Sequence, residues 1–81
     1  MYTAYVLQDK NGKFYRGLTN NLARRLSEHK RGKTKTTSKM RELKTVYTEE
    51  HEKYNTARKR ELYLKSSAGR RFLKKQLAIE V

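Results

Sequence analysis

Two segments rich in apolar and aromatic β-forming residues, 2–8 and 13–18, open the chain. The polar turn signal Asp9-Lys10-Asn11-Gly12 lies between them, so the pattern predicts a β-hairpin. A further segment of the same kind, Leu43 to Glu49, predicts a third strand.

The first predicted helix follows the hairpin and carries polar residues on the stripe that normally faces a core. That stripe, at positions i, i+3, i+4 and i+7, consists of Leu22, Arg25, Leu26 and His29. Asn20 or Asn21 can cap the helix, which we expect to run to about Arg31. An arginine and a histidine on an inward stripe indicate either local salt bridges or a functional role.

Two more helices are predicted in the second half of the chain. We expect one capped by Asn55 or Thr56 that runs to about Ser66, and another capped by Ser66 or Ser67. The inward stripe of the former places one carboxylate among apolar residues: Ala57, Glu61, Leu64 and Ala68. The order β-β-α-β-α-α predicts an α+β fold, with a small three-stranded antiparallel sheet flanked by helices.

Composition limits the size of the fold and its partners. Hydrophobic residues make up 35% of the 81 residues, enough for one small core, so we expect a single domain over 1–81. Lys and Arg number 21 against 8 Asp and Glu, a net charge of +13. So strong a self-repulsion is tolerated mainly when the partner is a polyanion, with nucleic acid as the first candidate and an anionic membrane surface as the second.

Several classes of protein are disfavoured. No apolar stretch is long enough to span a bilayer and no signal peptide follows Met1, so we expect no membrane partner. We expect a cytoplasmic protein that associates with the nucleoid when bound to DNA. The absence of Cys removes disulfides, thiolate zinc sites and thiol chemistry.

A basic loop is predicted over residues 32–39, next to the end of the first helix. We expect this region to track phosphates without reading sequence, through Lys30, Arg31, Lys33, Lys35 and Lys39. The alternative interpretation is an ordinary solvated loop.

A spaced set of residues connects these elements. It consists of Thr3-Ala4-Tyr5, Tyr15-Arg16-Gly17, Thr19, Asn21, Leu22, Arg25, Leu26, His29 and Glu61. The set resembles the GIY-YIG endonuclease superfamily, in particular its short members without a separate DNA-binding domain. Thr3 and Ala4 replace the glycine and isoleucine of the first triplet, and Arg16 replaces the isoleucine of the second. Members often carry an asparagine after the helical glutamate, and no residue here matches it.

The resemblance implies metal-dependent hydrolysis of DNA phosphodiester bonds. We expect DNA as the partner, with RNA as the alternative, and no small-molecule cofactor. The resemblance also implies Glu61 as the only direct protein ligand of one Mg²⁺ or Mn²⁺ ion, which would keep several waters. Arg25 would donate to phosphate oxygens. Tyr5 or Tyr15 would act as the base, with a pKa lowered from about 10 by nearby cations. His29 would orient a group or relay a proton.

A shared active site requires both phenols on one face of the hairpin. A two-residue Asn-Gly turn would place Tyr5 and Tyr15 on opposite faces, because a shift of one residue turns a strand over. We therefore expect a three-residue loop with Gly12 left-handed in a G1 bulge. Tyr5 would then lie opposite Gly17, and Tyr15 opposite Leu7.

Each of these residues alone has an ordinary structural interpretation. Tyr5 and Tyr15 could be strand core residues, Arg25 could pair with a glutamate, and His29 could be a partly buried neutral side chain. Glu61 could pair with a lysine one turn later. All five in one spaced pattern favour the catalytic interpretation.

Two alternatives remain open at this stage. One is a basic module that binds DNA or RNA without cutting it, and the other is a basic structural protein of the ribosome-associated kind. For a nuclease, we expect selection by DNA structure rather than by sequence, because the first helix leaves no obvious recognition face.

Overall fold

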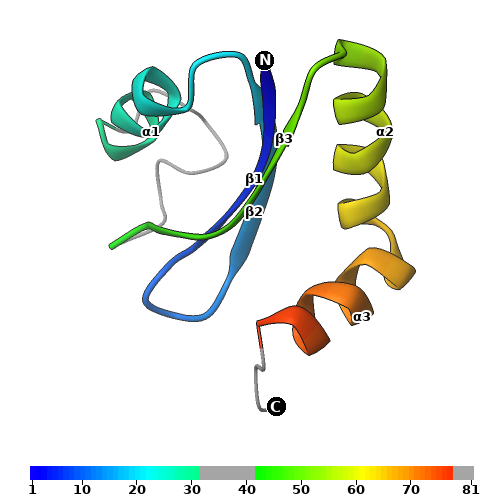
Figure 1. Cartoon of the computed structure of the whole chain (residues 1–81). Helices are drawn as coiled ribbons and strands as arrows, with labels where there is room; N and C mark the ends of the chain where they lie inside the picture. Colours follow the sequence, from blue (N-terminus) through cyan, green and yellow to red (C-terminus); the bar gives the residue numbers. More distant parts are fainter. Residues whose placement is uncertain (32–41, 78–81) are drawn as a thin grey trace.

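The computed structural model describes residues 1–31 and 42–77, which form a sheet with helices on both of its faces (Figure 1). The elements in chain order are β1 (Tyr2–Gln8), β2 (Phe14–Thr19), α1 (Leu22–Lys30), β3 (Lys44–His51), α2 (Tyr54–Lys65) and α3 (Ser67–Gln76). The sheet is antiparallel with strand order β2-β1-β3. The predicted α+β fold and element order are confirmed.

The central strand β1 is buried on both faces because helices lie on both sides of the sheet (Figure 1). Ala4 and Val6 point toward α2 and α3, where they form the main core with Leu64 and Leu73. Tyr5, which alternates with them, points to the opposite face and toward α1. The two faces of the sheet therefore separate a hydrophobic core from a polar cluster.

The hairpin loop has the predicted three-residue form. Gly12 has φ 85° and donates its N–H to the carbonyl of Asp9 at 3.0 Å. Asp9 donates its own N–H to the carbonyl of Lys13 at 3.0 Å, and its carboxylate accepts the N–H groups of Asn11 and Lys13. A left-handed glycine is needed at this point of a G1 bulge, so the loop chemistry fixes the strand register.

The resulting register is the one predicted from the loop. Tyr5 pairs with Gly17, and Leu7 pairs with Tyr15, so both phenols lie on the same face. A Cβ atom at Gly17 would lie 2.5 Å from the Tyr5 ring, well inside van der Waals contact. Glycine is required there because the Tyr5 ring crosses directly over the backbone of β2.

The predicted N-caps are confirmed for α1 and α3 but not for α2. Asn21 caps α1, and Ser66 caps α3 by accepting the N–H of Gly69 at 3.1 Å. The predicted cap of α2 is wrong, because Lys53 is the N-cap and makes no side-chain cap hydrogen bond. The predicted Asn55 lies inside the first turn.

Tertiary contacts explain the early start of α2. Strand β3 continues two residues beyond its predicted end, and His51 pairs with Tyr2. The Tyr2 ring also packs edge-on against Tyr54, with ring centroids 5.5 Å apart. Aromatic packing of this kind offsets the missing side-chain cap.

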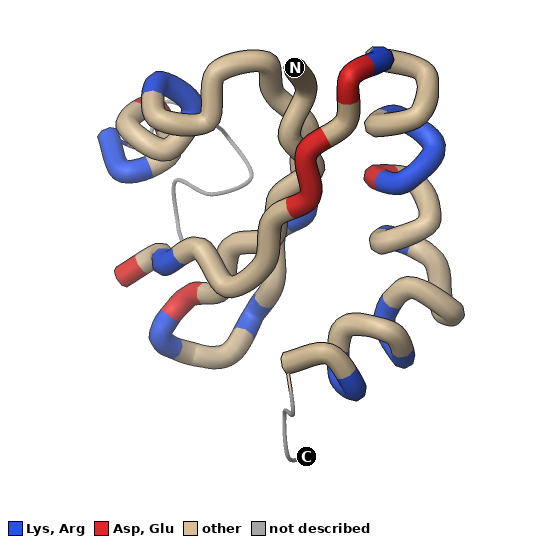
Figure 2. Tube along the Cα trace, in the orientation of Figure 1, with Lys and Arg blue, Asp and Glu red and all other residues tan. Residues whose placement is uncertain are grey.

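Charge is unevenly distributed over the described residues. Lys and Arg are found on α1, α2, α3 and the hairpin, whereas Glu49 and Glu50 are neighbours on β3 and α3 carries no Asp or Glu (Figure 2). The predicted basic loop 32–39 lies outside the described residues. None of the helices in the described ranges is long and apolar enough to cross a membrane.

Candidate active site

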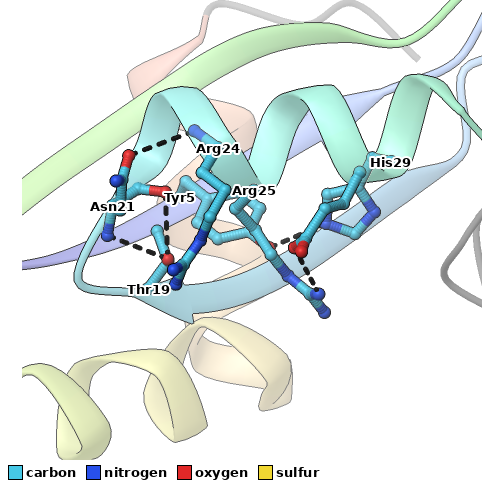
Figure 3. A network of polar contacts seen from close by, with 7 residues as sticks. Tyr5, Thr19, Asn21, Arg24, Arg25 and His29 are labelled. Carbon is cyan, nitrogen blue, oxygen red and sulfur yellow. Dashed lines mark hydrogen bonds and ion pairs between the residues drawn. The ribbon is translucent and has the colours of Figure 1, made fainter.

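The first element of the site is a buried hydrogen bond between the sheet and α1. The hydroxyl of Tyr5 lies 2.8 Å from Nε2 of His29, and the two side chains come from positions 24 residues apart (Figure 3). Tyr5 is 0% exposed and His29 only 2% exposed. This contact ties the end of α1 to the central strand.

Tyr15 and Arg25 complete a four-residue cluster around that bond. The Tyr15 ring packs against His29 with centroids 4.8 Å apart and against Tyr5 with centroids 6.2 Å apart. Arg25 projects from α1 toward the same side chains and pairs with Glu28 at 3.2 Å (Figure 3). We call Tyr5, Tyr15, Arg25 and His29 the phenol cluster.

The start of α1 is fixed by the residues between β2 and the helix. The hydroxyl of Thr19 donates to the carbonyl of Asn21 at 3.2 Å and accepts its N–H at 3.1 Å. The Asn21 side chain accepts the N–H of Arg24 at 3.1 Å (Figure 3). These short-range bonds set the rotation of α1 and thereby aim Arg25 at the sheet.

Glu61 lies on α2 and makes no described contact with the phenol cluster. It is 7% exposed, and its two carboxylate oxygens accept from Arg58 at 2.6 Å and pair with Lys65 at 3.4 Å. It lines a cavity of about 380 Å³ that is also lined by Thr19 and Asn20, from the end of β2. The structure thus brings four of the five predicted residues together and places the fifth in a cavity that begins where β2 meets α1.

Comparison with known proteins identifies the family. The model of the GIY-YIG catalytic domain matches residues 1–75. The chain belongs to the GIY-YIG family. Members of this family are generally nucleases, so membership indicates nuclease activity in general.

A solved structure supports the same assignment. The UPF0213 protein BH0048 from Bacillus halodurans, solved by solution NMR, is 28% identical to this GIY-YIG domain. The match covers 94% of this chain and 85% of that one, with a TM-score of 0.59. None of the curated proteins matches the chain.

Both motif triplets of the GIY-YIG domain lie on the hairpin, on adjacent strands. Tyr5 ends the first triplet, and its partner Gly17 ends the second. The two tyrosines face α1, whereas Arg16 pairs with Val6 and belongs to the opposite face. The alternation of β2 therefore sends neighbouring motif residues to different surfaces.

Burial controls the protonation of the cluster. Desolvation raises the pKa of Tyr5 to about 12, against an opposing effect of hydrogen bonding to Arg25. For Tyr5 the expected net lowering of the phenol pKa is wrong. Arg25 acts in the lowering direction, but removal from water outweighs it. Burial, followed by the charge of Arg25, lowers the pKa of His29 below 6.5. Tyr5 therefore keeps its proton, and its hydroxyl shares a hydrogen bond with Nε2 of a neutral imidazole.

Arg25 is held as a permanent cation next to the phenols. Hydrogen bonding to Tyr5 is the main cause that raises its pKa, and bonds to Glu28 and Tyr15 act in the same direction. A planar guanidinium in this position can donate to an anion that approaches the cluster.

The surroundings of Glu61 fit a divalent ion that keeps most of its waters. Within residues 1–31 and 42–77, no group of three or more His, Cys, Asp or Glu could hold a metal, so a site with several protein ligands is not built there. Mg²⁺ accepts a single carboxylate when water fills the remaining positions, and the cavity beside Glu61 has room for such an ion. Arg58, with a side chain 47% exposed, can leave the carboxylate by a change of rotamer.

Two arginines on α2 were not anticipated from the sequence. Arg58 covers Glu61, and its i, i+3 spacing from a glutamate is the signal that could have identified it. Arg60 donates to both oxygens of Glu49 on β3, at 2.9 and 2.8 Å, and its guanidinium lies 4.6 Å from the Tyr63 ring centroid. This clamp fixes α2 against the sheet and thereby positions the adjacent Glu61.

The lowered pKa of His29 predicts that the fold loses stability in mild acid. As the pH falls through about 6.5, the unfolded chain takes up a proton that the buried imidazole does not accept, so the unfolded state is favoured. The Tm should therefore decrease between about pH 7.5 and about pH 5.5. His29→Gln should lower the Tm at the higher pH, since the bond with Tyr5 is weakened, and flatten the pH dependence. If the Tm of the variant fell with decreasing pH as steeply as that of the wild type, His29 would not be the source of the pH dependence.

Proposed function

We propose that this GIY-YIG domain is a metal-dependent endonuclease that hydrolyses DNA phosphodiester bonds and selects its substrate by structure rather than by sequence. The observation that carries the proposal is the phenol cluster, in which one permanent cation and two phenols meet a neutral imidazole. Hydrolysis of a phosphodiester needs a base for water and a donor for the developing charge. The cluster offers both types of group on one face of the sheet.

In this proposal Arg25 binds the scissile phosphate. Its guanidinium lies beside the two phenols, and a phosphate oxygen could replace Glu28 as its acceptor. The donor would act most strongly on the charge that develops in the transition state, because the fixed cation needs no reorganisation there.

The two tyrosines take different roles. Tyr5 is fully buried with a pKa raised to about 12, so it serves as a positioning residue that fixes His29 through a hydrogen bond. Tyr15 is only half-buried and lies against both His29 and Tyr5. Tyr15 is therefore our candidate for the base that accepts a proton from the attacking water.

Glu61 would hold one Mg²⁺ or Mn²⁺ ion, which supplies charge neutralisation and an activated water when bound. The cavity next to Glu61 begins at Thr19 and Asn20, the residues that join β2 to α1. A phosphodiester that crosses the end of β2 could thus approach Glu61 from one side and Arg25 from the other.

Substrate selection would rest on charge and shape. Lys30 and Arg31 are exposed at the end of α1 and can contact phosphates beside the phenol cluster. Lys33, Lys35 and Lys39, the other predicted phosphate contacts, lie outside the described residues. Phosphate contacts carry no sequence information, so discrimination would follow the path of the DNA backbone.

A second candidate function is a module that binds nucleic acid without cutting it. The ion pairs of Glu61 with Arg58 and Lys65 favour it, because they neutralise the carboxylate that a metal would need. The first of the following predictions separates the two functions.

Removing the charge of Glu61 or of Arg25 should strongly reduce cleavage without abolishing DNA binding. Glu61→Gln should reduce Mg²⁺-dependent cleavage to the metal-free background while DNA affinity stays equal or increases, because a negative charge is lost. Arg25→Ala should lower kcat by about 10²–10³-fold. The matched controls are Glu52→Gln and Arg24→Ala, which change the same charges at exposed positions. Wild-type turnover in the Glu61 or Arg25 variant, with contaminating nuclease excluded, would refute the assigned roles.

The tyrosine assignment predicts an order of effects. Tyr15→Phe should lower kcat by about 10²–10⁴-fold, the range of general-base catalysis. Tyr5→Phe should cost less and should change the imidazole signals of His29 in NMR spectra, because Nε2 loses its hydrogen bond with the phenol. Single-turnover cleavage at saturating DNA measures both variants. A larger loss for Tyr5→Phe than for Tyr15→Phe would reverse the assignment.

A further inference from the structure

Arg16 is a cation on the face of β2 that points away from the phenol cluster. It pairs with Val6, a member of the core beneath α2 and α3, and is half-buried. Its guanidinium carbon lies 5.5 Å from the ring centroid of Phe14. An edge strand next to a hydrophobic core thus carries a charge where an apolar residue would pack.

The hydrogen-bonding capacity of Arg16 is not used within the described residues. Its Nε atom is buried and has no hydrogen-bond partner there, and no described carboxylate forms an ion pair with it. Burial, together with the like charge of Arg70 on α3, lowers the pKa of Arg16. A half-buried charge is costly when it has no counter-ion, so with the partners that residues 1–31 and 42–77 provide, this arrangement is unfavourable.

Helix α3 extends this positive surface. Its four charged residues are all cations and all exposed: Arg70, Arg71, Lys74 and Lys75. They form like-charge pairs at i, i+4, which destabilise a helix. Figure 2 shows these cations along α3, which lies on the other side of the sheet from α1. Repulsion within α3 and across to Arg16 would be relieved by an anion.

We propose that Arg16 and Arg70 bind a phosphate of the nucleic-acid backbone at a second site, separate from the phenol cluster. The inference rests on the proposed function, because it assigns a further contact to the same substrate. Guanidinium groups bind phosphate oxygens through paired hydrogen bonds, which would satisfy the buried Nε of Arg16. Since β2 is an edge strand, a backbone that crosses it can meet Tyr15 on one face and Arg16 on the other. The second site would hold the strand in place while the first acts on it.

The test is a salt titration of DNA binding in EDTA, so that no cleavage is required. Arg16→Gln/Arg70→Gln should make the slope of log K against log salt shallower by about 0.9 for one bound phosphate and about 1.8 for two. Lys10→Gln/Lys59→Gln is the matched control, since it removes two exposed charges elsewhere and should leave the slope close to the wild-type value. Arg70→Gln alone changes only an exposed side chain and should give part of the effect. It should also raise the Tm of the free protein, because it removes a repulsion.

The outcomes distinguish this inference from the proposed function. If the wild type does not bind DNA, the proposed function and the inference both fail. If it binds and cleaves but the arginine variants keep its slope, or if Arg70→Gln lowers the Tm, only the inference is overturned. Inorganic phosphate and phosphatidylserine vesicles serve as competing probes. Loss of either interaction in the arginine variants with unchanged DNA binding would assign the site to free anions or to lipid and overturn the nucleic-acid assignment.

Discussion

The contact of Tyr5 with Gly17 and His29 is the constraint on which the arrangement of this protein depends. The Tyr5 ring can cross β2 only because Gly17 has no side chain, and its hydroxyl then reaches Nε2 of His29 on α1. Side-chain contacts of this kind attach α1 to the sheet. The same contact removes Tyr5 from water, which keeps it protonated and leaves Tyr15 as the more accessible phenol.

The edge strand β2 organises the surfaces on which function is proposed. Its side chains alternate between the two faces of the sheet, so that Tyr15 points toward α1 and Arg16 toward α3. The residues at the end of β2 line the cavity next to Glu61. Helix α2 is held in register by Arg60, which joins β3 to the aromatic side chains of the helical layer. The core thus holds Tyr15, Arg16 and Glu61 around one strand edge, where a nucleic-acid backbone could contact all three under the proposed function.

Much of this fold is predictable from local chemistry. Gly12 and the polar residues before it determine the hairpin loop, and the loop determines the register that places both phenols on one face. The start of α2 is not predictable in this way, because packing of Tyr54 on Tyr2 outweighs the capping preference of Asn55. The pKa of Tyr5 is not predictable for a related reason, since the number of cations is visible in the sequence but the depth of burial is not.

The measurement that tests the central claim most directly is cleavage by the wild-type protein. Branched and linear DNA of the same sequence would be incubated with Mg²⁺ or Mn²⁺ and, in parallel, with EDTA. Our account predicts metal-dependent cuts near the branch point in several unrelated sequences, and weaker cutting of the linear duplex. Tight binding of both substrates with no cleavage under any of these metal conditions would contradict it and would identify the protein as a binding module.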